Sequence, residues 1–527
     1  MNNLHYFKNY EKKQYSYNLI LYIPLDIWRI IFDILDFKSK IKLISTCKYL
    51  RQNLYIVDLW NIEEKYLEKL TTRILKYYIF RNVVSLDAYD NNKIKDISFM
   101  KNLKKLRTFF KCGIDQSIIN KLDLFDLIID YNDKIINVSF MKNLKILSIS
   151  GSHVIDQNGI EKLDLIELNI EDNNKIKDVS FMKNLKILYA SGNCGVDQNG
   201  IKGLDLIELD IENNNKINDV SFMKNLKILY ASYAYRINQN GINGLDLIEL
   251  YVRNNNKIFD VSFMKNLKIL NASYDCGINQ NGIKELDLIE LNVERNNKIK
   301  NVSFMKNLKK LNASYDCGID QNGINGLDLI ELNVNNNNNI VDVSYMKNLK
   351  ILYACGICGI DQNGIKGLDL IELNVNDNNK IKIVSYMKKL KKLYAYYDCG
   401  IDQKGIKKLD LIELHANQNK KIKNVSFMKN LKILYANNDC GIDQNGIKGL
   451  DLIELYAGNN KRIKNVSFMK NLKILDASGI CRINQNGIEG LNLIELNCNY
   501  NTKIKDVSFM KNLKKLYTEG NYNIKRY

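Results

Sequence analysis

Cysteine and histidine are the residue types in this sequence best able to bind a metal, form a disulfide or act as nucleophiles. Eleven cysteines and three histidines occur in 527 residues. Cys355 and Cys358 have the two-residue separation of a redox motif. The histidines His5, His153 and His415 are so far apart in the sequence that neither a zinc trio nor a catalytic triad is expected from them.

The spacing of the cysteines argues against both zinc and disulfides. If each 41-residue step adds two stacked strands, successive copies are about 10 Å apart, whereas a disulfide needs Cα atoms within about 7 Å. We therefore predict a column of small buried thiols, with no catalytic residue, metal site or cofactor. Eight cysteines lie whole multiples of 41 residues apart: Cys112, Cys194, Cys276, Cys317, Cys358, Cys399, Cys440 and Cys481.

The 41-residue period runs through most of the chain. The string LDLIEL begins at Leu163 and recurs every 41 residues to Leu450, and variants of VSFMKNLK keep the same period. Each period contains two segments that read L-x-x-L-x-L/A-x-x-N-x-x-I/V, one beginning at Leu165 and one at Leu185. This is the signature of leucine-rich repeats, whose short strands point alternate apolar residues into a core shared with neighbouring coils.

We call the two segments the A coil and the B coil. A coils start at Val83 and recur to Leu493, eleven times, and B coils start at Leu103 and recur to Leu513, also eleven times, so about 22 coils are expected. The A coils resemble the short internalin-like class, with an extended or 3₁₀ outer side. The B coils resemble the cysteine-containing class, one residue short. The asparagine at the ninth position, as in Asn173 and Asn193, is expected to form a buried hydrogen-bonding ladder. The predicted fold class is an α/β solenoid, a leucine-rich-repeat horseshoe with a parallel concave sheet.

Residues ahead of Val83 lack the repeat and contain Pro24, the only proline of the chain. Proline suits the first turn of a helix, and Ile27, Ile30 and Ile31 follow it at helical spacing. A second amphipathic segment contains Leu43 and Cys47. A helical unit of about 40 residues is too small to be very stable alone, so a partner would help it.

This N-terminal segment resembles an F-box. The resemblance covers about 40 residues: Ile23 and Pro24 match its opening pair, Asp26 its acidic position, and Cys47 and Lys48 its later motif, while Leu50 stands where the family often has tryptophan. Together with the repeats, the chain resembles F-box/LRR-repeat proteins of eukaryotes and large DNA viruses. That resemblance implies a substrate-recognition adaptor in a cullin–RING ubiquitin ligase of the SCF type, and not an enzyme.

Two residue sets follow. The F-box is expected to dock a Skp-family adaptor, and thereby the cullin complex, through Pro24, Leu25, Ile27, Ile30, Ile31, Leu35, Leu43 and Leu50. The concave face is expected to bind the substrate protein where exposed aromatic residues gather, since rigid exposed tyrosines are good interface anchors. Those residues are Tyr353, Tyr394, Tyr396, His415, Tyr435 and Tyr456.

The predicted domains are an N-terminal extension (1–19), an F-box (20–56), one helical linker that also caps the repeats (57–82) and the leucine-rich repeats (83–527). One alternative is a plain interaction scaffold whose helices only cap the solenoid. Another is a nucleic-acid-binding solenoid that uses lysines such as Lys183 and Lys224, because the net charge is +18. A column of nine glutamates on the A strands, from Glu167 to Glu495, disfavours nucleic acid on the concave face.

No apolar run reaches the ~18 residues that span a bilayer, and the N-terminus makes a poor signal peptide. We therefore expect no membrane partner and a cytoplasmic or nuclear location, in the host cell if the protein is viral.

Overall fold

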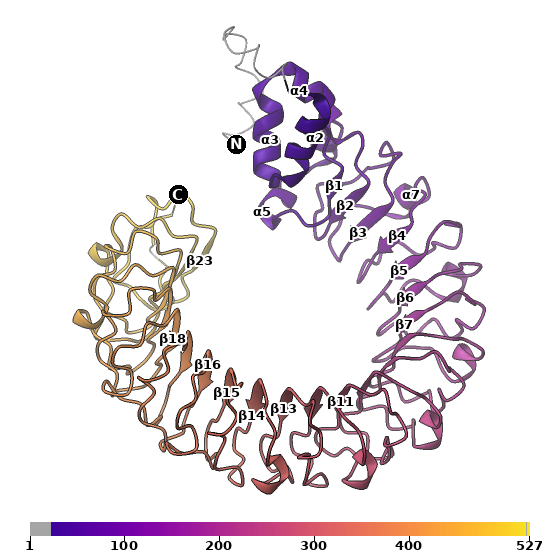
Figure 1. Ribbon diagram of the computed structural model, residues 1–527. Helices are drawn as coiled ribbons and strands as arrows, with labels where there is room; N and C mark the ends of the chain where they lie inside the picture. The colour runs from indigo at the N-terminus through magenta and orange to yellow at the C-terminus, as the bar shows by residue number, and fades with distance from the viewer. Residues whose placement is uncertain (1–22, 523, 527) are drawn as a thin grey trace. The chain divides into compact units, whose positions relative to one another are not determined.

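The computed structural model describes residues 23–522 and 524–526 (Figure 1). The chain divides into two compact units, the first ending at Leu247 and the second running from Ile248 to Tyr527. The predicted N-terminal extension, residues 1–19, lies outside the described residues, as does His5. Each unit is described separately below.

Three short helices open the described chain: α2 (Leu25–Ile34), α3 (Phe37–Thr46) and α4 (Lys48–Asn53). Pro24 is the N-cap of α2, one position before the first helical residue, and its carbonyl accepts hydrogen bonds from the Ile27 and Trp28 N–H groups. Asp36 caps α3 by accepting the Ser39 N–H at 2.8 Å. Cys47 caps α4, where its Sγ accepts the Leu50 N–H at 3.4 Å. The expected helical unit is present as three helices, which we call the helical trio, and Cys47 has a structural role in it.

The prediction of one helical linker over residues 57–82 is wrong. This segment contains strand β1 (Asp58–Leu59), helices α5 (Glu64–Leu67) and α6 (Thr72–Leu75) and the 3₁₀ turn η2 (Tyr78–Phe80). β1 pairs in parallel with the next strand, so the sheet begins before the first recognisable repeat. Two residues of strand carry too little periodicity to be read from sequence.

In the first unit each strand pairs in parallel with the next along the chain. Its remaining strands are β2 (Ser85–Ala88), β3 (Lys105–Thr108), β4 (Asp126–Ile128), β5 (Ile146–Ser148), β6 (Glu167–Asn169), β7 (Ile187–Tyr189), β8 (Glu208–Asp210) and β9 (Ile228–Tyr230). Its outer turns are α7 (Gln116–Ile119), η3 (Gln157–Gly159), η4 (Asn199–Ile201) and η5 (Asn240–Ile242).

The second unit repeats the same parallel order. Its strands are β10 (Glu249–Tyr251), β11 (Ile269–Asn271), β12 (Glu290–Asn292), β13 (Lys310–Asn312), β14 (Glu331–Asn333), β15 (Ile351–Tyr353), β16 (Glu372–Asn374), β17 (Lys392–Tyr394), β18 (Glu413–His415), β19 (Ile433–Tyr435), β20 (Glu454–Tyr456), β21 (Ile474–Asp476), β22 (Glu495–Asn497) and β23 (Lys515–Tyr517). Its 3₁₀ turns are η6 (Asn281–Ile283), η7 (Asn322–Ile324), η8 (Asn445–Ile447) and η9 (Asn486–Ile488).

These strands confirm the predicted parallel solenoid built from leucine-rich-repeat coils. In most strands the middle residue is a buried leucine and its two neighbours lie on the opposite, partly exposed face, which we call the sheet face. In one A coil, Leu373, Val375, Ile381, Val384 and Met387 are all completely buried. Each such side chain contributes about 1.5–3 kcal/mol on burial. Within each unit the stacked coils therefore share an apolar core.

The asparagine ladder is confirmed for the A coils, and the last B coil adds Asn521, which is buried and donates to the Asn501 carbonyl at 2.8 Å. Asn378 is buried, and its Nδ2 donates to the carbonyls of Ala354 (2.9 Å) and Ile360 (3.2 Å) in the preceding B coil. The corresponding asparagine of the B coils was predicted to be equivalent, but Asn193 is exposed. The B coils bury the following residue instead, as in Cys194.

A second polar ladder, made by glutamine, was not expected. Gln403 in a B coil donates through Nε2 to the Asn424 carbonyl at 2.8 Å, and its Oε1 accepts the N–H groups of Lys423 and Asn424 in the next A coil. The signal was present in the sequence, because a glutamine occupies this position in each B coil from the first, at Gln116, to the tenth, at Gln485. Two side-chain ladders therefore join each B coil to the A coil that follows it.

Candidate interaction surfaces

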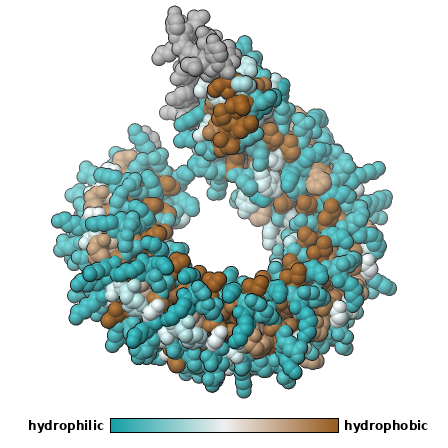
Figure 2. All heavy atoms as spheres, viewed as in Figure 1, coloured by the Kyte–Doolittle hydropathy of each residue, from teal (hydrophilic) through white to brown (hydrophobic). Residues whose placement is uncertain are grey.

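Helix α2 has an apolar face with no covering element among the described residues. Ile27, Ile30 and Ile34 are 46%, 60% and 79% exposed. Figure 2 shows hydrophobic residues gathered over α2 and α3. Phe32 lies on the opposite side of α2 and is buried, so it anchors the helix to its neighbours. The helix thus has two apolar sides: the side with Phe32 is packed against its neighbours, and the side with the three isoleucines is exposed.

The predicted adaptor-binding residues divide into three groups. Pro24, Ile27 and Ile30 are exposed, while Leu25, Ile31, Leu35 and Leu43 are partly buried. Leu50 is 0% exposed, so its prediction as a contact residue is wrong. Ile34, the most exposed isoleucine of the helix, was left out of the predicted set although its helical spacing was visible in the sequence.

Leu50 is buried because α4 packs toward the solenoid. Leu54 and Ile56 follow it and are also buried, and the Ile56 N–H donates to the Ile79 carbonyl at 2.8 Å. The helical trio is therefore fixed to the start of the repeats by its last helix, which leaves the exposed face of α2 available.

The sheet face of the second unit carries a stack of four aromatic rings, which we call the aromatic stack. Tyr394, His415, Tyr435 and Tyr456 occupy the same register position on β17 to β20. Successive ring centroids are 4.3, 4.0 and 4.1 Å apart, with interplanar angles of 25°, 12° and 5°. In-register parallel pairing places these side chains one strand spacing apart, which suits ring stacking.

Hydrogen bonds fix the orientation of the stack. His415 Nε2 lies 2.7 Å from Glu413 Oε1, and the Tyr456 hydroxyl donates to Glu454 Oε2 at 2.9 Å. Burial lowers the pKa of His415 below its usual value despite the opposing effect of Glu413. Although burial raises it, the pKa of Glu413 is lowered overall by the hydrogen bond from His415 and the charge of Lys392, whose Nζ lies 3.3 Å from it. The imidazole is thus a neutral Nε2–H donor to an ionised carboxylate.

The other two predicted aromatic residues lie outside this stack. Asn374 on β16 separates Tyr353 from Tyr394, and the Tyr353 hydroxyl donates to Glu372 at 3.0 Å. Tyr396 lies two residues beyond Tyr394 on the same coil, where its ring meets Tyr397 edge-on at 5.0 Å. Of the six predicted residues, four therefore form the aromatic stack, and Tyr353 and Tyr396 lie beside it.

Isoleucines border the aromatic stack and were not predicted as part of it. Ile412 and Ile453 are exposed residues directly before β18 and β20, and Ile433 and Ile474 are partly buried at the first positions of β19 and β21. The repeated Ile of LDLIEL could have signalled the first two, and the repeated Ile of LKIL the other two. Rigid aromatic residues that lie close together are typical of the centre of a protein-binding surface.

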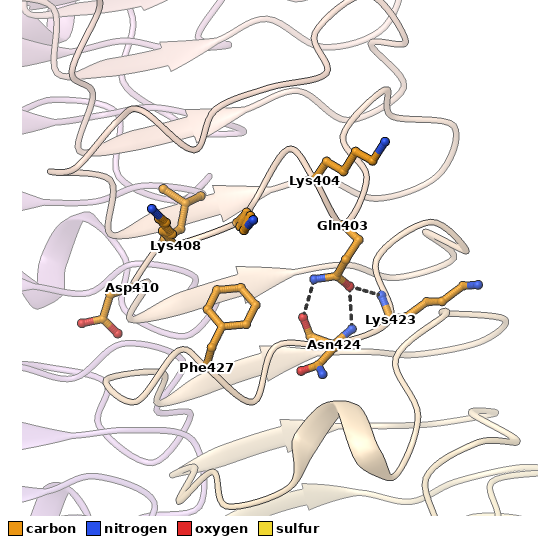
Figure 3. Close-up of a pocket in the computed structure, with 9 residues that line it drawn as sticks. Gln403, Lys404, Lys408, Asp410, Lys423, Asn424 and Phe427 are labelled. Atoms are coloured by element: carbon orange, nitrogen blue, oxygen red, sulfur yellow. Dashed lines mark hydrogen bonds between the residues drawn. The ribbon is translucent and has the colours of Figure 1, made fainter.

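A basic depression of about 750 Å³ lies on the outer side of the second unit. It is lined by Lys404, Lys407, Lys408, Lys423 and Phe427, among others (Figure 3). Figure 3 shows that the side-chain amide of Gln403, which also lines this depression, is engaged in the glutamine ladder. The lining contains exposed lysines and no nucleophile with a partnered base.

The eleven cysteines are free thiols, and ten of them are buried. Burial raises the pKa of Cys358 to about 11 and that of the partly buried Cys355 to about 12. A redox or metal-binding cysteine needs the opposite shift, toward the thiolate. Among residues 23–522 and 524–526, no cluster of three metal-ligating side chains occurs and no helix is long and apolar enough to cross a membrane.

No protein-family profile matches this sequence, and no curated protein matches it either. Solved structures with a similar fold include a chain of the TLR13–ssRNA13 complex, at 16% identity and a TM-score of 0.41, over 88% of this chain and 83% of that one. The functional domain of InlJ from Listeria monocytogenes, which includes a cysteine ladder, matches at 16% identity and a TM-score of 0.31, over 77% and 79% of the chains. A chain of the Rad7–Elc1 complex in yeast matches at 17% identity and a TM-score of 0.37, over 62% and 92%.

Proposed function

We propose that this chain is a substrate-recognition adaptor of a cullin–RING ubiquitin ligase, with the N-terminal helices acting as an F-box. In this role the protein makes and breaks no bonds. It holds a target protein near the ubiquitin-carrying enzyme, which raises the effective concentration of the target's lysines. Such a protein would act in the cytoplasm or the nucleus.

The observation that carries the proposal is the exposed apolar face of α2. A small soluble helix normally buries its isoleucines, and an apolar surface left exposed on a fixed helix is typical of a docking site. Ile27, Ile30 and Ile34 form such a surface, on helices that α4 fixes to the first coils. The match of residues 23–48 to the F-box pattern supports a Skp-family adaptor as the occupant.

The aromatic stack supports the other half of the proposal, the capture of a target protein. It presents rigid ring edges and tyrosine hydroxyls beside isoleucines on one sheet face. Replacement of Tyr394 and Tyr435 by alanine should weaken target capture and leave adaptor binding unchanged.

The first test is a pull-down of a purified Skp-family adaptor with the full chain. Burial of two isoleucines contributes roughly 3–6 kcal/mol, so the variant Ile30→Lys/Ile34→Lys should bind at least ~100-fold more weakly. The matched control is Ile357→Lys/Ile480→Lys, because these isoleucines of the repeats are also exposed, at 71% and 56%. Wild-type protein that does not bind the adaptor, or an α2 variant that binds as well as the control, would contradict the proposal.

A second candidate function is a plain interaction scaffold in which the helices only cap the repeats. The burial of Leu50, Leu54 and Ile56 favours it, since these residues do cover the start of the solenoid. Capping alone gives no reason for the exposed isoleucines of α2. Absence of adaptor binding, with target binding through the sheet face retained, would favour this candidate.

A further inference from the structure

The sheet face of the first unit differs in charge from the rest of this basic protein. From β4 to β9, the residues that face outward include seven carboxylates and no lysine or arginine. We call this surface the acidic face. Its carboxylates are Asp126, Asp130, Glu167, Glu171, Glu208, Asp210 and Glu212.

Several of these acids depart from the repeat. In the second unit, asparagine is the commonest residue at the positions of Glu171 and Asp210, as in Asn376 and Asn333, and the only acid at either position is Glu294. The A strands there keep one acidic residue each at the first position, as in Glu331. Extra carboxylates are thus concentrated in the first unit, although single ones such as Glu294 and Asp476 occur in the second, and general solubility does not account for the cluster.

Among the described residues, no ion pair neutralises Asp130, Glu167, Glu171, Glu208 or Asp210. At the border of the face, Lys105 pairs with Oδ2 of Asp126 at 3.1 Å, and Arg107 pairs with Asp87, outside the face, at 3.0 Å. The nearby Lys145 and Lys186 donate to the carbonyls of the turn aspartates Asp164 and Asp205.

These carboxylates are held at an energetic cost. Burial, followed by the charges of Asp126 and Glu208, raises the pKa of Glu167. Burial is also the largest cause that raises the pKa of Asp210 to about 6, with the charges of neighbouring glutamates adding to it. Asp126 has a side chain that is 8% exposed, and its Oδ1 has no hydrogen-bond partner among the described residues. A cationic partner would relieve both the repulsion and the unpaired oxygen.

The geometry also indicates the form of that partner. The acids lie on the A strands β4, β6 and β8, which are separated by about 10 Å at ~4.8 Å per strand. Between them, Ile146 on β5 and Ile187 and Tyr189 on β7 present apolar and aromatic groups. A peptide in the extended polyproline II conformation advances ~3.1 Å per residue with three residues per turn, so every third side chain points the same way and meets the next acidic row. Aliphatic stems of arginine or lysine would cover the isoleucines, while their charged ends meet the acids.

A depression of about 630 Å³ lies at one end of these rows, lined by Glu171, Asp172, Ser191 and Asp210, among others. We propose that the acidic face docks an extended basic segment of a partner protein, with arginine or lysine at every third position. This docking is separate from adaptor binding by α2 and from the aromatic stack, and it does not depend on the proposed function.

The test measures binding of fluorescent peptides to the full chain by anisotropy at low and high salt. The probe is Arg-Ala-Ser-Arg-Ala-Ser-Arg, and the register control is Arg-Arg-Arg-Ala-Ser-Ala-Ser. The variant Glu171→Asn/Asp210→Asn removes two charges with residues that the repeat itself uses at these positions. The matched charge control in the second unit is Glu331→Gln/Glu372→Gln.

We expect the spaced peptide to bind the wild-type chain more tightly than the clustered one, with affinity that falls as salt rises. Loss of two ion pairs should weaken binding by about 2- to 30-fold in the acidic-face variant, and the control variant should bind as the wild type does. Absence of binding, or equal weakening in both variants, would overturn the proposal. Saturable terbium binding that millimolar calcium reverses, together with complete displacement of the peptide by calcium, would overturn it in favour of a cation site.

Discussion

The asparagine ladder allows a sharp prediction about stability, because neighbouring coils carry the same sequence position in two environments. Asn378 is the ninth residue of an A coil and is 1% exposed, whereas Asp398 is the ninth residue of the following B coil and is exposed. Asn378 donates to the carbonyls of Ala354 and Ile360, and its Oδ1 accepts the Lys380 N–H at 3.0 Å.

The substitution Asn378→Ala leaves two carbonyl oxygens and one N–H without these partners in a buried position. A buried polar group without a partner costs about 1–3 kcal/mol. We therefore expect the free energy of unfolding of the second unit to fall by about 3–5 kcal/mol, allowing for some relaxation of the backbone. Asp398→Ala should change it by less than ~0.5 kcal/mol, because that side chain is at the surface.

Urea unfolding, followed by circular dichroism, gives the change in midpoint for both variants. Native-state hydrogen exchange at the Lys380 amide reports the local loss, which matters because repeat arrays can open coil by coil. The reasoning is refuted if Asn378→Ala costs less than ~1 kcal/mol, or if the two substitutions destabilise equally.

Two further predictions concern the second unit. Because burial holds the pKa of His415 below its unfolded value of 6.5, the unfolded state binds more protons as pH falls below 6.5. Stability should therefore decrease from pH 6.5 down to the folded pKa of His415, and the variant His415→Tyr should show a shallower decrease in urea midpoints over that window. In the outer turn, a Cβ on Gly364 would lie 2.1 Å from the Val341 carbonyl, whereas one on Gly367 meets only the end of a lysine at 3.7 Å. Gly364→Ala should thus lower the melting temperature far more than Gly367→Ala, whose positive φ of 77° costs about 1 kcal/mol; equal losses would contradict this account.

The coil register was predictable because its signal is repeated many times. A leucine at the middle of each strand recurs in every copy, so even a weak preference becomes decisive when eleven A coils and eleven B coils agree. The two ladders show the limit of this reasoning. Asn173 and Asn193 share one consensus position, yet only Asn173 is buried, since the B coil turns one residue later and buries Cys194. Gln403 is repeated just as regularly. Its hydrogen-bond partners, however, are backbone groups, which every residue has, so the sequence does not indicate where they lie.

The candidate surfaces were predictable to a smaller extent. Helical spacing placed Ile27 and Ile30 on one exposed face, but spacing alone did not distinguish them from Leu50, which α4 buries. The aromatic stack was expected from residues 41 or 20–21 positions apart, since parallel pairing in register brings such residues together. The acidic face was harder to recognise, because its charge is visible only when the outward positions of three separate strands are read as one surface.

The glutamine and asparagine ladders both join a B coil to the A coil after it, while the next joint, from A to B, combines backbone contacts with other side chains, such as Asn376, whose Oδ1 accepts the Tyr396 N–H at 3.1 Å. There the Val384 N–H donates to the Gly405 carbonyl and the Gly400 N–H to the Asn378 carbonyl. The two joints are therefore not interchangeable, and the indivisible building block is the whole 41-residue pair. An insertion or deletion of one A–B pair in the gene keeps all the B-to-A and A-to-B hydrogen bonds possible. Loss of a single coil instead places two coils of the same type next to each other, and their hydrogen-bonding groups do not match. The array can thus lengthen or shorten during evolution only in steps of two strands.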